Sequence, residues 1–115
     1  MSQNRADIEE IEISIEEAKK VVARANDIRT LCENPIFKKL VMDGYFVQEA
    51  ARLAHLSSDP SIDEKIRGYV LRDLAGPGAF KRYIQTLINM GNAARNELAM
   101  SEEALDELRA EEAAE

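Results

Sequence analysis

The 115-residue sequence has few of the residues that build disulfide frameworks, strands or active sites. It holds one Cys, one His, no Trp, three Pro and five Gly, and aromatic residues make up 5 % of it. A single cysteine excludes an intrachain disulfide and a cysteine-based metal site within one chain. No apolar run approaches the about 18 residues of a membrane span, and the first ten residues lack the layout of a signal peptide. We therefore expect no membrane association and a cytoplasmic location.

Catalytic patterns are also missing. His55 is the sole histidine and has no HExxH or ExxH neighbour. Gly76-Pro77-Gly78 is not followed by the Gly-Lys-Ser/Thr of a phosphate loop. Asp59 and Asp63 stand four residues apart, but helix capping explains both without a metal. The sequence predicts no catalytic, metal or cofactor site, no small-molecule substrate and hence a non-enzymatic protein.

What the sequence does contain is helical periodicity. Hydrophobic residues make up 45 % and charged residues 32 % of the chain, a composition typical of helical proteins. Residues 7–33 are expected to form one helix about 40 Å long at 1.5 Å per residue. An apolar seam with 3-4-3-4-3 spacing, typical of a coiled coil, runs along it. The seam consists of Ile8, Ile11, Ile15, Ala18, Val22 and Ala25. It can pack against the chain's own helices or against a second copy.

Further helices follow from capping and turn signals. Asn34-Pro35 predicts a helix start. Asp43-Gly44 favours a break over one long helix, Ser57 to Ser61 is a polar linker, and Gly76-Pro77-Gly78 predicts a tight corner. Ser101 is expected to cap a last short helix over residues 102–110. The predicted fold is therefore all-α.

In that fold, a long N-terminal helix packs on a compact bundle of four to five helices. The expected segments are an amphipathic helix over residues 1–33, a bundle core over residues 34–100 and an acidic helix and tail over residues 101–115. Together they form one domain, because the length suffices for a single modest core.

Charge is distributed unevenly along the chain. Residues 1–17 carry six acids and one Arg, residues 101–115 carry seven acids and one Arg, and residues 18–100 carry 13 bases and nine acids. Three readings stay open: solvation, contact of the acidic ends with a basic surface, and nucleic-acid binding by the middle. Basic surfaces for the second reading are Lys38-Lys39 and Lys81-Arg82 of neighbouring copies, or a basic partner. The third is the least favoured, because no clustered basic stripe is present.

The segment FKKLVMDGYFVQEAARLAHLSSDPSI, followed by a Gly-rich corner and an acidic tail, resembles small helical proteins of tailed bacteriophages. The resemblance covers residues 35–112 and carries over no functional residue. It implies a role in head or virion assembly, as a scaffold, core or accessory component that contacts other proteins in many copies. It also places the protein in the host cytoplasm or the virion.

These observations predict a structural or assembly protein that acts through protein–protein contacts. We expect it to self-associate through the seam from Ile8 to Ala25, as a homo-oligomer or a larger assembly. The alternative is a small regulatory or inhibitory protein whose acidic ends bind a basic site on a host protein or mimic nucleic acid. DNA binding by the middle region ranks third.

Overall fold

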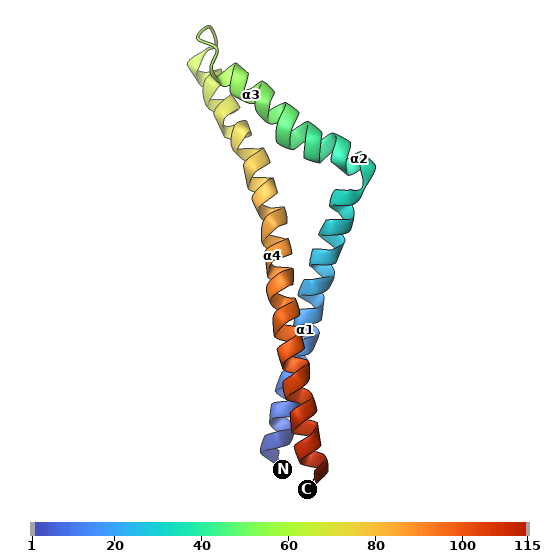
Figure 1. The fold of residues 1–115 in the computed structure, drawn as a ribbon. Coiled ribbons are helices and arrows are strands. Elements are labelled where there is room, and N and C mark those ends of the chain that lie inside the picture. Colours follow the sequence, from blue (N-terminus) through green and yellow to red (C-terminus); the bar gives the residue numbers. More distant parts are fainter. Residues whose placement is uncertain (1, 115) are drawn as a thin grey trace. The chain divides into compact units, whose positions relative to one another are not determined.

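The chain is helical throughout, apart from short connections. The computed structural model describes residues 2–114, and no strand occurs among them, so the all-α prediction is confirmed. The elements are α1 (Ser2–Glu33), α2 (Pro35–Phe37), the π-helix η1 (Lys38–Glu49), α3 (Ala50–Ser57) and α4 (Glu64–Ala114) (Figure 1). Because α2, η1 and α3 follow one another without a gap, they form one continuous helical segment. Within residues 2–114, no helix has both the length and the apolarity needed to cross a membrane.

Contacts along the chain divide it into two units. Unit 1 comprises Met1–Asp27 and Leu87–Glu115, and unit 2 comprises Ile28–Thr86. Unit 1 therefore joins the two ends of the sequence, and unit 2 holds its middle.

Unit 1 is an antiparallel pair formed by α1 and α4. Arg5 contacts Glu112, Glu12 contacts Arg109, and Asn26 contacts Arg95, so residue numbers rise along one helix as they fall along the other. The least exposed positions keep a 3-4 spacing on both helices, which is the signature of a coiled coil. On α4 these positions are Leu87, Gly91, Ala94, Leu98, Ser101, Leu105, Leu108 and Glu112.

The seam of unit 1 changes from bulky to small side chains along its length. At one end Ile8, Ile15 and Leu105 form a buried cluster, against which further Ile and Leu side chains pack. At the other end Ala25 is fully buried, and a Cβ added to Gly91 would collide with the Cβ of Ala25. Only a pair of such small residues permits so close an approach of two helices.

Unit 2 is built around the contact between the helix of residues 35–57 and the first part of α4. The ring of Phe80 lies 5.4 Å from that of Phe46, edge to face, and 6.4 Å from that of Tyr45. These distances are typical of stabilising aromatic pairs. Leu53 and Val70 are buried on the same two helices.

The connection between these helices is held by polar contacts. The guanidinium of Arg67 donates to the carbonyl oxygens of Ser57 and Asp59. Ser61 donates two hydrogen bonds to the Asp59 carboxylate, one from its backbone N–H over 2.9 Å and one from its hydroxyl over 2.7 Å. These bonds lower the pKa of Asp59. The predicted polar linker is thus confirmed, as is the Asn34 cap, whose side chain accepts from Ile36 and Phe37.

The predicted bundle of four to five helices is wrong. Residues 2–114 form three helical segments, one of them 51 residues long. Three expected breaks lie inside helices: Gly44 within η1, Gly76-Pro77-Gly78 within α4, and Ser101 also within α4. The expected short helix over residues 102–110 is therefore the end of α4. In each case packing along a continuous helix outweighs the local preference of the residue.

The physical reason differs between the three sites. At Gly44 an added Cβ would lie 3.0 Å from the carbonyl oxygen of Lys39, five residues earlier, so this glycine serves a close approach within the π-helix. At Gly76 the added Cβ would collide with the hydroxyl of Tyr45, so that glycine makes room for the other helix of unit 2. Ser101 occupies a seam position of unit 1, where the heptad pattern runs on through it.

We expect Gly91→Ala to lower the free energy of unfolding by about 1–2 kcal/mol, because overpacking a closely packed contact costs more than the gain in helix propensity. Gly68→Ala is the matched control. Its new Cβ meets nothing within 4 Å, so it should raise that free energy by up to about 1 kcal/mol. Urea unfolding followed by circular dichroism measures both. Adding Ala25→Gly to Gly91→Ala should restore stability. A Gly91→Ala variant as stable as the Gly68→Ala control would contradict the close contact.

The contact between Gly76 and Tyr45 gives a second prediction for unit 2. Gly76→Ala as a single substitution should lower the free energy of unfolding. It should lower that free energy much less in a chain that also carries Tyr45→Phe, because this second substitution removes the colliding hydroxyl. The coupling in a double-mutant cycle should reach about 1 kcal/mol. Gly78→Ala, whose Cβ would enter open space, is the control and should show no coupling to Tyr45→Phe. Equal coupling at both glycines would refute the assignment.

Candidate interaction surfaces

The six predicted seam residues all lie in unit 1, against α4 of the same chain. Ile8, Ile15, Ala18 and Ala25 are buried, and Ile11 and Val22 are half-buried. Of the two arrangements that the sequence left open, the structure has the packing against the chain's own helix. Self-association through this seam stays a prediction, and it requires another helix to join or replace α4.

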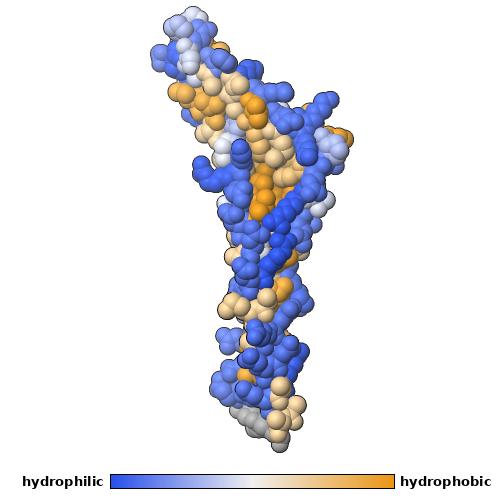
Figure 2. All heavy atoms as spheres, in the orientation of Figure 1, coloured by the Kyte–Doolittle hydropathy of each residue, from blue (hydrophilic) through white to orange (hydrophobic). Residues whose placement is uncertain are grey.

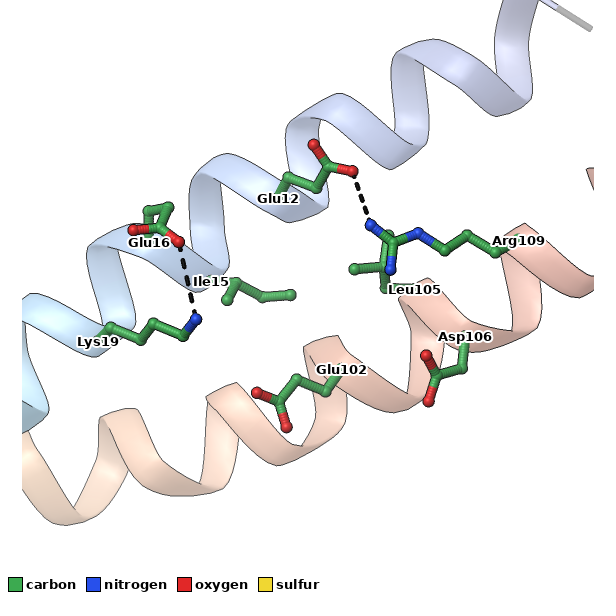
Figure 3. Close-up of a pocket in the computed structure, with 8 residues that line it drawn as sticks. All are labelled: Glu12, Ile15, Glu16, Lys19, Glu102, Leu105, Asp106 and Arg109. Atoms are coloured by element: carbon green, nitrogen blue, oxygen red, sulfur yellow. Dashed lines mark hydrogen bonds and ion pairs between the residues drawn. The ribbon is translucent and has the colours of Figure 1, made fainter.

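One flank of the seam is charged. A groove of about 560 Å³ runs along this flank, with Ile15 and Leu105 at its base (Figure 3). The other residues of its lining each stand one position after a seam residue. The carboxylate of Glu12 pairs with the guanidinium of Arg109 over 3.0 Å across the groove, and Lys19 pairs with Glu16 over 3.7 Å along α1. These groups are largely solvated, so each pair contributes at most about 1 kcal/mol.

The charged flank also defines the register of the pair. Lys19 follows Glu12 by seven residues, and Glu102 precedes Arg109 by seven. The same register therefore brings Lys19 opposite Glu102. Asn26 follows Lys19 by seven residues and Arg95 precedes Glu102 by seven, and these two side chains are in contact. The signs alternate along the flank, and a shift of the antiparallel pair by one heptad would place like charges together.

Part of the other flank of the seam is apolar. A groove of about 420 Å³ runs there, and most of its lining residues stand one position before a seam residue. Ile13, at the edge of this groove, is 65 % exposed, and Met90 across it is 44 % exposed. The complete lining is Ile13, Ser14, Glu17, Ala18, Val21, Met90, Ala93, Ala94 and Glu97. This apolar groove has no ion pair across it comparable to that of Glu12 and Arg109.

The two units differ in net charge. Unit 1 carries 15 acidic and six basic residues, a formal charge of −9. Unit 2 carries seven acidic and nine basic residues, a formal charge of +2. The acidic ends of the sequence thus belong to one folded unit, a relation that the charge distribution along the chain does not show.

Unit 2 exposes many large apolar side chains. Figure 2 shows hydrophobic surface over the helix of α2, η1 and α3 and over the first part of α4, whereas the coiled coil of unit 1 is mostly hydrophilic. The exposed residues are Leu31, Ile36, Leu40, Val47, Ile66, Tyr69, Leu71 and Tyr83. Two of them, Ile36 and Leu40, stand one helical turn apart on either side of Lys38 and Lys39.

Within residues 2–114, no three or more His, Cys, Asp or Glu side chains lie together in a group that could bind a metal ion. His55 is exposed on α3. Three surfaces thus distinguish the described residues: one charged flank, one apolar groove and one exposed apolar face.

The continuous seam of α4 is not among the features predicted from the sequence. Ser101 resembles an N-cap, so the sequence divides the leucines and small residues from Leu87 to Leu108 between two expected helices. The 3-4 spacing runs unbroken through Gly91 and Ser101 and was the signal that could have identified the coiled-coil partner of α1.

No protein-family model, no curated protein and no solved structure matches this chain. The resemblance to small helical proteins of tailed bacteriophages therefore stays a prediction. Any functional assignment has to be argued from the surfaces of the two units.

Proposed function

We propose that this chain is a non-enzymatic structural or assembly protein that associates with further copies of itself. The observation that carries the proposal is the different character of its two units. Unit 1 is strongly acidic, and unit 2 has a slight basic excess and exposes eight large apolar side chains.

Exposed apolar side chains support a protein partner. Single exposed apolar residues are normal on any protein, but many of them on one small unit are typical of interaction surfaces. In unit 2 they occur within 59 residues, next to basic side chains such as Lys38 and Lys39. Such a surface fits a partner that is both apolar and acidic.

Unit 1 has these two properties. Its apolar groove contains exposed Ile13 and Met90, and the unit as a whole carries a charge of −9. One chain therefore holds two complementary surfaces, so association of many copies needs no second protein. This kind of role agrees with the assembly proteins that the sequence resembles, in a virion or in the host cytoplasm.

A second candidate is a regulatory protein whose acidic unit occupies a basic site on a host protein. The concentration of 15 acidic residues in unit 1 favours it. This candidate predicts a monomer or dimer whose affinity for a basic protein falls steeply with salt, since such contacts are mainly electrostatic. Duplex DNA should compete for the same basic protein.

Self-association predicts that the solution mass rises with protein concentration above the 12.9 kDa of one chain. Size exclusion coupled to light scattering measures this mass. Cys32→Ser is the control, because Cys32 is the sole cysteine and a disulfide between copies would mimic a dimer. The variant should show the same masses as the parent. A parent that stays at the mass of one chain at every concentration contradicts self-association and favours the regulatory candidate.

A further inference from the structure

We infer that the apolar groove of unit 1 binds the first turns of the α2–η1 helix from another copy, with Ile36 and Leu40 inserted into it. The inference rests on the proposed function and names the surfaces through which the copies meet. The occupant is a second copy of this chain, and the contact is between unit 1 of one copy and unit 2 of the next.

The groove offers an apolar floor with an acidic rim. Ala18, Ala93 and Ala94 leave space between the two helices, and Ile13 and Met90 stand at the edges with much of their surface in water. Burying such side chains removes apolar surface from water, which favours association. Glu17 and Glu97 lie beside this floor, one on each helix. Glu17 pairs with Lys20 of its own helix over 3.4 Å, but this pair is exposed and contributes little. Glu97 and the net charge of unit 1 therefore favour a segment with positive charge next to its apolar residues.

The Ile36–Leu40 turn has that composition. Ile36 is 67 % exposed and Leu40 is 62 % exposed, and they project from successive turns. Lys39 follows Ile36 by three residues and borders the face that Ile36 and Leu40 share, whereas Lys38 lies on the opposite side of the helix. No acid occurs from Asn34 to Val41.

This turn is also ordered before it binds. The side chain of Asn34 accepts from the backbone N–H of Ile36 over 2.9 Å and from that of Phe37 over 3.1 Å. A capped helix start pays less conformational entropy on binding than a flexible segment would.

Charge decides which surfaces can meet. Two apolar grooves face to face would bring Glu17 and Glu97 of both copies together, and two Ile36–Leu40 turns would bring Lys39 of both copies together. Like charges across an interface disfavour the wrong pairing, whereas the cross pairing of groove with turn joins opposite charges. A contact between two different surfaces is heterologous, so copies are linked head to tail into rings or open chains.

Charge reversal tests this pairing. A groove variant carries Glu17→Lys and Glu97→Lys, and a turn variant carries Lys38→Glu and Lys39→Glu. Each alone should raise the dissociation constant of self-association on the order of 100-fold, as expected for like charges brought together. A chain with all four substitutions has the net charge of the parent and restores opposite charges across the contact, so it should associate again. Light scattering over a concentration series measures each mass.

The matched control is Glu103→Lys with Asp106→Lys, which changes the net charge as the groove variant does but lies outside the apolar groove. It should keep most of the parent's association, and circular dichroism should show the same helicity for all four variants. A groove variant that still associates like the parent, or a four-fold variant that stays a monomer, overturns the inference while self-association of the parent stands. A parent that is itself a monomer at every concentration contradicts the proposed function and this inference together.

Discussion

The heptad seam shared by α1 and α4 is the constraint on which most of this structure depends. A helix of 51 residues gains little stability from its own hydrogen bonds in water and needs a packed face along its length. The last half of α4 finds that face on α1, with Ile and Leu at one end and the close contact of Ala25 with Gly91 at the other. The first part of α4 finds it on the helix of residues 35–57, through Phe80, Phe46 and Tyr45. Continuous packing explains why α4 does not stop at Pro77, where a ring inside a helix costs about 3 kcal/mol.

How much of this could be read from the sequence depends on whether the cause is local. The first helix with its seam, the Asn34 cap and the linker before α4 follow from periodicity and capping chemistry within a few residues, and the structure confirms them. The glycines show why the rest could not be read. Gly44, Gly76 and Gly91 each lie close to an atom in a different turn or helix, so their role is steric space, not chain reversal. A rule that assigns glycine to a turn uses only adjacent residues, whereas the atom that requires a glycine at these positions belongs to another turn or another helix.

The two flanks of the seam differ in how far their side chains are paired. On the flank of Glu12 and Arg109, charges of alternating sign meet across the two helices and disfavour a shift of register by one heptad. Once these charges are paired, that flank has little to gain from another protein. On the flank of Ile13 and Met90, apolar side chains remain in water above a floor of alanines. The seam itself follows from the sequence of α1. The difference between its flanks depends also on the residues of α4 that lie opposite.

Antiparallel pairing also decides where the charge of the chain lies. The acidic segments 1–17 and 101–115 are far apart in sequence, yet they fold into the same unit because α1 and α4 run in opposite directions. Concentrating a charge of −9 in one unit raises its self-repulsion, which destabilises the unit. The pairs of Arg5 with Glu112 and of Glu12 with Arg109 offset part of it. A basic surface next to the apolar groove would offset more of it, and we propose that unit 2 of another copy supplies such a surface.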